Sequence, residues 1–201
     1  VCFANYKSLD ESQFKGITEG IPPIVPAPAP RQVNAAEIER FWKLLPDLSG
    51  RATKLTLVGP KQPPITIVYP PGGRVTRFAA NELQKYLVQM TGQRPAIGND
   101  PAAKGRLLLL INADSIPVGG PVPVGLLPEV GTDAFIIRTC HDRVVIAGGS
   151  ERAVLFGVYD LLERLGCRWF GPLEEYIPHV TTLETPVLDI HQKPALRWRG
   201  F

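Results

Sequence analysis

The sequence contains few cysteines and no long hydrophobic run, and each scarcity excludes a class of protein. Its three cysteines, Cys2, Cys140 and Cys167, lack metal-ligand spacing, and an odd number cannot form a complete disulfide framework. A bridge between Cys140 and Cys167 stays possible if their strands are neighbours. No apolar run approaches the roughly 20 residues that a helix needs to cross a bilayer, so no membrane span is predicted.

An excess of charge of one sign is also missing. The net charge is +3, and basic residues are scattered among acidic ones rather than gathered in a stripe, so nucleic-acid binding is not expected. Hydrophobic residues make up 44% of the chain and charged residues 20%, which allows a packed core. The chain begins at Val1 rather than Met, which suits a processed or trimmed N-terminus, although no signal peptide is visible.

Residues 1–51 are predicted to form an irregular, proline-rich N-terminal segment with one short helix. The prolines of residues 21–30 favour polyproline II, because proline fixes φ and donates no hydrogen bond. Asn34 can cap a helix, with Glu37 three residues further on. This helix has an apolar stripe of Ile38, Phe41, Trp42 and Leu45, and Pro46 ends it.

Two further helices are predicted from their apolar faces, over about Thr76–Thr91 and Glu151–Leu165. In each, apolar residues recur at the spacing of one helical face, and polar residues occupy the other side. Gly92 suits a left-handed cap at the end of the first helix. Ser150 suits an N-cap of the second, and Gly166 stops it.

Strands are predicted where short apolar runs lie between proline and glycine clusters. The continuous run within 106–112 indicates a strand buried on both faces, whereas 113–131 is rich in glycine and proline and predicts a long loop. The predicted strands are Leu55–Val58, Ile65–Tyr69, Arg106–Asn112, Ala134–Thr139, Arg143–Ala147 and Cys167–Phe170, with an extended tail from Leu183 to Phe201.

These elements predict an α/β fold. Two helices that are apolar on one side need a sheet face to cover them, and placing both on the same face is the most economical arrangement. We therefore expect a two-layer sandwich, with a mixed β-sheet and two helices on one face, preceded by the irregular proline-rich segment.

Two polar constellations look like sites, and each has a simpler structural interpretation. His141 and Asp142 are adjacent in a predicted hairpin turn and should point apart, which favours turn formation over catalysis. The turn Gly148-Gly149-Ser150 leads into a helix N-terminus, where anions bind well, yet neither phosphate-loop pattern is present. A sharp glycine turn followed by a serine cap explains the same residues.

No catalytic residue, metal site or cofactor is predicted within the chain. The histidines are far apart in sequence and no HExxH motif exists. Glycosidases use two carboxylates across the scissile bond. However, Glu174 and Glu175 are neighbours expected to face opposite ways, and Asp160 and Glu163 share the solvated face of the second helix.

Aromatic residues gather towards the C-terminal end, at Trp169, Phe170, Tyr176 and Trp198. Such side chains can stack on sugars, form an interface with a following domain, or pack in a core. The sequence leaves these three interpretations open.

The segments around the two predicted helices resemble a known family. Ala80–Leu87, followed by Thr91-Gly92, resembles the first helix of the domain that precedes the barrel in certain glycoside hydrolases. Gly148–Phe170 resembles the second helix and last strand of that domain in alpha-glucuronidases of glycoside hydrolase family 67, although Ala153 stands where the family often has glycine. The closing Pro194–Phe201 also fits, and related domains precede the barrel in family 20 beta-hexosaminidases.

The resemblance implies a domain organisation and a role. Residues 52–190 would be the pre-barrel α/β domain, 1–51 an N-terminal extension, and 191–201 the start of a catalytic barrel that the sequence lacks. Such a barrel needs about 250 residues and carries the active site. We therefore expect a non-catalytic domain of a larger, secreted or periplasmic glycosidase, which contacts the barrel and meets carbohydrate only through it.

The only candidates for substrate contact lie on the would-be first barrel strand. The resemblance implies Arg199, with Arg197 as the alternative, and strand alternation puts Trp198 on the opposite face from both. The parent protein would act on plant polysaccharide such as glucuronoxylan. Two other functions remain open: a stand-alone carbohydrate-binding or adhesion module with Trp169, Tyr176 and Trp198 as a stacking platform, and a structural module with a protein partner.

Overall fold

A six-stranded mixed sheet lies at the centre of the fold in the computed structural model, which describes residues 35–45, 54–116, 127–171 and 174–194. The strand order is β10-β5-β6-β4-β2-β3, with β3, β2, β4 and β6 parallel and β5 antiparallel to both of its neighbours. The bounds are β2 Ile65–Val68, β3 Ala96–Gly98, β4 Arg106–Asn112, β5 Phe135–Cys140, β6 Arg143–Gly148 and β10 Asp189–Gln192.

Two shorter ladders accompany the sheet. Strand β1, Leu55–Val58, pairs with β9, Leu183–Thr185, and β7, Arg168–Trp169, pairs with β8, Glu175–Tyr176, in a small hairpin. The predicted strand at 55–58 therefore exists, but it lies outside the main sheet. Strand β3 was not predicted, because three residues between a proline and a bend are too few to show a period.

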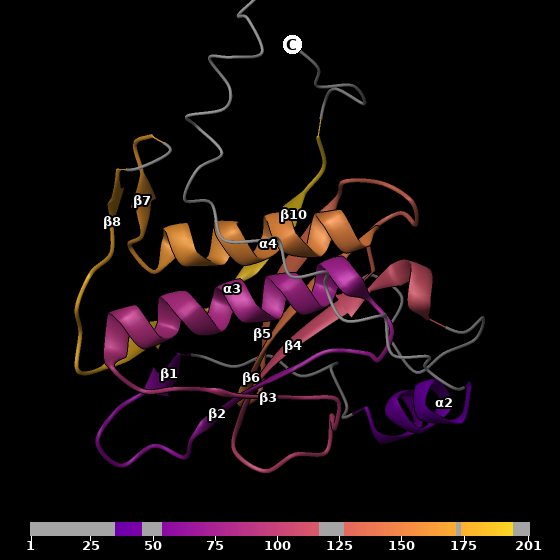
Figure 1. Cartoon of the computed structure of the whole chain (residues 1–201), viewed down its shortest axis with the longest axis horizontal. Coiled ribbons are helices and arrows are strands. Elements are labelled where there is room, and N and C mark those ends of the chain that lie inside the picture. Colours follow the sequence, from indigo (N-terminus) through magenta and orange to yellow (C-terminus); the bar gives the residue numbers. More distant parts are fainter. Residues whose placement is uncertain (1–34, 46–53, 117–126, 172–173, 195–201) are drawn as a thin grey trace, which may run out of the picture. The chain divides into compact units, whose positions relative to one another are not determined.

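Both long helices cover the same face of the sheet, as predicted, and lie side by side (Figure 1). They are α3, Arg74–Thr91, and α4, Glu151–Arg164. Their apolar stripes pack against the strand residues that alternate towards them, among which are Leu108, Leu110 and Ile146. The α/β class and the two-helix layer predicted from the sequence are confirmed.

A third helix, α2 (Ala35–Leu44), packs against the opposite face. Its Phe41 and Trp42 are buried edge to face, with ring centroids 5.1 Å apart, in a cluster with Leu107, Leu109 and Val145. The short helix predicted in the N-terminal segment therefore adds to the core of the sheet. Because both faces are covered, five consecutive residues of β4, Leu107–Ile111, are buried, as its continuous apolar run predicted.

The signals predicted for the two long helices are confirmed, whereas Asn34 and Pro46, predicted to begin and end the short helix, lie outside the described residues. Gly92 ends α3 in the left-handed region, with φ 71°, and its N–H donates to Val88 O at 2.8 Å. Ser150 caps α4, where its Oγ accepts from the N–H of Ala153 at 3.2 Å. Gly166, which follows α4, has φ 107°, so a side chain there would be strained.

The cysteines Cys140 and Cys167 form no disulfide. Cys140 belongs to the cluster on the α2 side of the sheet, whereas Cys167 packs on the α3–α4 side, with its Sγ 3.8 Å from Met90 Sδ. Burial raises the pKa of the Cys167 thiol, which disfavours the reactive thiolate. The sheet itself separates the two thiols, so the bridge that the sequence left possible is not formed.

Some predictions fall on residues that are not described. The proline-rich segment, the central part of the loop at 117–126, and the end of the tail at 195–201 lie outside the described residues, as does Cys2. Next to that loop, Ala113–Ser115 forms a short 3-10 helix, η1. Among the helices that are described, none is long and apolar enough to cross a membrane.

The start of α3 is capped from a distance. Gly73, at its N-cap position, provides no side chain, and the carboxylate of Glu151 on α4 accepts instead from the N–H groups of Val75 at 2.7 Å and Thr76 at 3.0 Å. A carboxylate is favourable there because helix N-termini carry partial positive charge and unpaired N–H groups. Glu151 therefore joins the starts of both helices.

We expect Glu151→Ala to lower the free energy of unfolding by ~1 kcal/mol, the usual cost of losing a helix cap. Urea denaturation followed by circular dichroism measures this. Glu163→Ala, at an exposed position in the last turn of the same helix, is the control and should cost nothing. Equal losses in both variants would show that the cap contributes no stability.

Candidate functional site

The turn Gly148-Gly149-Ser150 lies where β6 leads into α4, at the carboxyl edge of the parallel strands. This is the edge at which α/β proteins commonly bind ligands. Both long helices begin here, so their N–H groups and positive dipole ends point the same way. The position makes this turn the first candidate for an anion site.

The loop that precedes β5 packs against this turn. The N–H of Gly149 donates to Ala134 O at 2.8 Å, and its carbonyl accepts from the N–H of Gly131 at 2.7 Å. A Cβ at Gly149 would lie 2.2 Å from Glu129 O, so only glycine lets the two backbones approach this closely. The glycine is therefore explained by packing of the loop.

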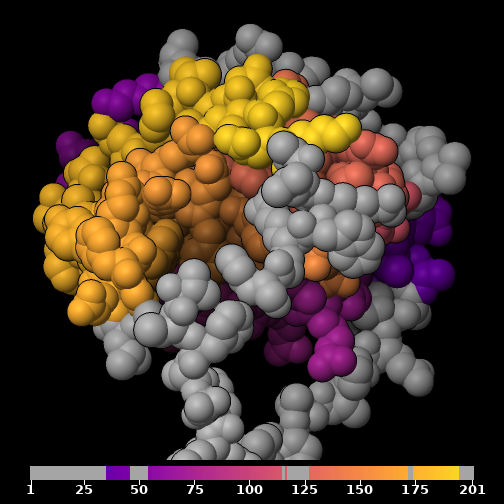
Figure 2. Space-filling view, turned by 90° about the horizontal axis from the view of Figure 1, so that it is seen from above, coloured from indigo at the N-terminus to yellow at the C-terminus, as the bar shows by residue number. Residues whose placement is uncertain are grey.

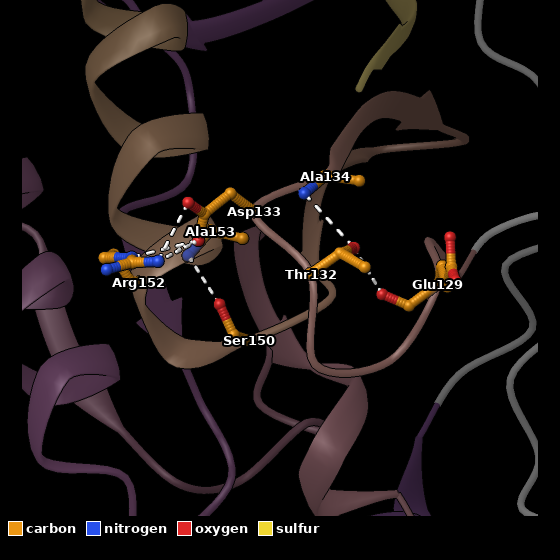
Figure 3. Close-up of polar contacts among 7 residues, drawn as sticks. All are labelled: Glu129, Thr132, Asp133, Ala134, Ser150, Arg152 and Ala153. Atoms are coloured by element: carbon orange, nitrogen blue, oxygen red, sulfur yellow. Dashed lines mark hydrogen bonds and ion pairs between the residues drawn. The ribbon is translucent and has the colours of Figure 1, made fainter. Parts of the chain in front are cut away.

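The side chains around the turn are paired with each other (Figure 3). Arg152 makes two bonds to the Asp133 carboxylate, both at 2.9 Å, and Ser150 caps the helix as described above. The Thr132 hydroxyl donates to Glu129 O at 2.6 Å and accepts from the N–H of Ala134 at 3.3 Å. These bonds engage the Arg152, Ser150 and Thr132 side chains within the fold, which favours the structural interpretation of the glycine turn.

We expect Gly149→Ala to lower the free energy of unfolding by about 1–3 kcal/mol, because its Cβ meets backbone atoms that cannot move away. The matched control is Gly98→Ala, where a Cβ would have nothing within 4 Å. Thermal unfolding of both variants measures the difference. An unchanged Gly149→Ala protein would mean that the loop before β5 is not held against the turn.

A second polar cluster, which we call the tyrosine cluster, lies between the helices and the β7–β8 hairpin. Tyr86, Tyr159 and Trp169 pack edge to face, with ring centroids 5.2–6.3 Å apart. The Trp169 indole N–H donates to the Tyr86 hydroxyl at 2.9 Å, and that hydroxyl donates to Glu175 at 2.9 Å. The hydrogen bonds connect α3 to both strands of the hairpin.

Tyr159 makes the matching bond between the helices, donating to Glu82 at 2.7 Å. Burial, followed by this bond to a carboxylate, raises the pKa of Tyr159 well above its ordinary value. Burial likewise raises the pKa of Tyr86. Both phenols therefore stay protonated at neutral pH and act as hydrogen-bond donors rather than as bases.

The hairpin register separates two of the aromatic residues predicted as a stacking platform. Trp169 is opposite Glu175, and Arg168 is opposite Tyr176. Directly opposed residues share a face and neighbours along a strand alternate, so Trp169 faces the tyrosine cluster while Tyr176 faces away from it. The two rings do not form one surface.

We expect Tyr86→Phe to loosen the hairpin, because the Trp169 N–H and the Glu175 carboxylate both lose their partner, at a cost of about 1–3 kcal/mol. Hydrogen exchange of the β7 and β8 amides should become faster, while the amides of β4 keep their protection. Tyr176→Phe removes an exposed hydroxyl and is the control. Unchanged exchange in Tyr86→Phe would contradict the hairpin's attachment through Tyr86.

The remaining sequence candidates take structural roles. His141, with φ 50°, and Asp142 form the tight turn between β5 and β6. Asp160 pairs with Arg164 one turn further along α4, at 2.7 Å. Across the described part of the chain, no group of three or more His, Cys, Asp or Glu side chains could hold a metal ion. Arg197, Trp198 and Arg199 lie outside the described residues, so their predicted contact with substrate stays a prediction.

The sequence analysis missed three apolar side chains on the outer side of the helix layer. Val75, Phe78 and Phe156 are 38%, 51% and 37% exposed, and we call them the helix-layer patch. The Glu151–Val75 and Tyr159–Glu82 hydrogen bonds fix the position of α4 along α3. They place Phe78 and Phe156 at similar positions along the two helix axes. The sequence did contain a signal for two of them, because Phe78 and Phe156 each lie outside the apolar stripe of their helix.

The described chain also leaves the fold at the carboxyl edge. Gln192, the last residue of β10, is paired with Phe135, which in turn is paired with Gly148 at the end of β6. The next residue, Lys193, forms an ion pair with Glu129 of the loop before β5, with Nζ 3.2 Å from Oε2. The described residues therefore end at the edge of the sheet at which α3 and α4 begin.

Comparison with known proteins identifies the type of domain. The family model described as Glycosyl hydrolase family 67 N-terminus matches residues 57–161, from β1 into α4. This agrees with the resemblance seen in the sequence. No curated protein matches the chain.

Solved structures with a similar fold belong to larger carbohydrate-active enzymes. A family 115 4-O-methyl-alpha-glucuronidase with specificity for decorated arabinogalactans superposes with a TM-score of 0.54 and 14% identity, over 72% of this chain and 19% of that one. The N-acetyl-beta-hexosaminidase of Streptomyces plicatus gives a TM-score of 0.46 and 19% identity, over 88% of this chain and 29% of its own. The first of these superpositions indicates a shared fold only, and the chain spans about a fifth of the glucuronidase.

Proposed function

The chain belongs to the family of glycosyl hydrolase family 67 N-terminal domains, and from this we propose that it is the non-catalytic front domain of a larger glycoside hydrolase. In this proposal residues 52–190, with the end of β10 at Gln192, support a catalytic barrel that would begin within 191–201, and residues 1–51 are an extension. The domain fixes the position of the barrel and does not perform the hydrolysis.

The observation that carries the proposal is the helix-layer patch. Single exposed apolar residues are common. Here, however, two phenylalanines lie at similar positions along neighbouring helices, on the side of the helices turned away from the sheet. Aromatic residues in such positions are typical of surfaces that pack against another domain. The chain also leaves the fold at the edge where these helices begin, so a following domain would start close to the patch.

The carboxylates of the fold support a non-catalytic role. Hydrolysis of a glycosidic bond needs two carboxyl groups with open space between them for the sugar. Glu82 and Glu175 each accept from a tyrosine hydroxyl, and Glu151 accepts from the start of α3. Those three carboxylates are engaged in holding helices and hairpin together.

The finer parts of the proposal concern substrate and location. The substrate class would be plant polysaccharide carrying uronic acid, such as glucuronoxylan, and the protein would be secreted or periplasmic. Arg199, with Arg197 or Trp198, would contact the sugar from the first barrel strand. Family membership supports this, as does the shared fold with a 4-O-methyl-alpha-glucuronidase.

We expect the 201-residue chain alone to release no product from glucuronoxylan or aryl glycosides, while the protein extended by its catalytic region does. In the extended protein Phe78→Asp should lower the melting temperature or separate the unfolding of the two domains, because a charge is buried in their interface. Differential scanning calorimetry measures this.

The control is Val187→Asp, at a position that is 48% exposed and lies away from the helix layer, beside the amino end of β6. Both substitutions should leave the melting temperature of the 201-residue chain unchanged, since both sites are exposed there. Hydrolysis by the chain alone, or equal effects of the two substitutions in the extended protein, would contradict the proposal.

A further inference from the structure

The β7–β8 hairpin presents a second apolar surface, separate from the helix-layer patch. Its inner face carries Trp169 and Glu175, which bind Tyr86. By strand alternation its outer face carries Phe170 and Tyr176, which are 73% and 57% exposed. Figure 1 shows the hairpin standing at the end of α4, and Figure 2 shows it at the left margin of the surface.

The hairpin is held firmly although it is short. An isolated two-stranded ribbon is barely stable in water, so its attachments decide whether it keeps one conformation. The tyrosine cluster fixes the inner face, and the Arg168 guanidinium donates to the carbonyls of Glu163 and Cys167 at 2.5 and 2.6 Å. A preordered surface loses little conformational freedom on binding, which favours association.

The charges around the outer face of the hairpin indicate which kind of molecule can bind there. Glu163, Glu174 and Glu175 have exposed side chains at or beside the hairpin. Of the nearby cations, Arg164 pairs with Asp160 and Lys85 with Glu82, so the three glutamates are opposed only by Arg168, which donates to carbonyls at the end of α4. The negative excess repels a uronic acid or another anionic sugar, and it suits an apolar protein surface with a basic rim.

We propose that the outer face of the β7–β8 hairpin, through Phe170 and Tyr176, docks on the catalytic domain that follows this chain. The inference rests on the proposed function, and it adds a second contact at the far end of α4 from the helix starts. Two contacts at separate places along the helix layer would prevent the domains from rotating about a single point. The relative that superposes over 72% of this chain does so with only 19% of its own length, so it contains enough further protein for both contacts.

Hydroxyl-radical footprinting tests the contact directly, because Phe170 and Tyr176 oxidise readily when exposed. The 201-residue chain and the protein extended by its catalytic region are compared. We expect several-fold slower oxidation of both residues in the extended protein. In the same protein Phe170→Asp should lower the temperature at which the domains unfold together, whereas Phe170→Leu, which keeps an apolar side chain, should not.

The outcomes separate the two proposals. If the extended protein hydrolyses glycosides but oxidation at Phe170 and Tyr176 is unchanged, the hairpin contact is wrong and the proposed function stands. If the extended protein is protected at both residues but hydrolyses nothing, the contact stands and the proposed function is wrong. Binding of xylo-oligosaccharides by the 201-residue chain that Phe170→Asp abolishes would replace the protein partner with a sugar and overturn the inference.

Discussion

The structure depends on covering both faces of the central strands. Residues 107–111 of β4 alternate between the two apolar clusters, so neither face can be left in water. Burial of apolar surface contributes roughly 25 cal/mol per Å², and these side chains are almost fully buried. Helices α3 and α4 provide one cover and the aromatic residues of α2 provide the other. Gly157 brings α4 close, since a Cβ there would lie 2.5 Å from Ile146 Cγ2.

The polar groups around the covered sheet form hydrogen bonds and ion pairs with one another. Glu151 completes the start of α3, the Asp133–Arg152 pair lies beside the start of α4, and the tyrosine cluster joins both helices to the hairpin. The bonds to the Tyr86 and Tyr159 hydroxyls satisfy partly buried groups that would otherwise be costly to remove from water. The side chains around the glycine turn, which suggested an anion site, are therefore engaged in contacts within the fold. What remains for function is the outer surface, where the helices and the hairpin expose a few large apolar side chains, Phe78, Phe156, Phe170 and Tyr176, among polar ones.

This division suits a domain whose role is to position another one. A supporting domain needs stiffness, which comes from helices fixed in register and from a hairpin attached through Tyr86. It also needs apolar contact area, which the helix-layer patch and the hairpin provide at different places along α4. A catalytic domain would need instead a recess with two unengaged acids, whereas Glu82 and Glu175 here each accept a hydrogen bond from a tyrosine.

The sequence by itself determined the helices, their caps, most of the strands and the α/β class. Those features depend on residues within a turn or two of each other: the apolar period, Ser150 at an N-cap, and Gly92 at a left-handed end. Only the tertiary structure decided that β1 pairs with β9, that α2 covers the second face, and that Trp169 and Tyr176 point apart. The same holds for Glu151, which caps a helix 75 residues away. These outcomes depend on contacts between distant segments, whose pairing is set by burial and register, and a local pattern contains no information about either.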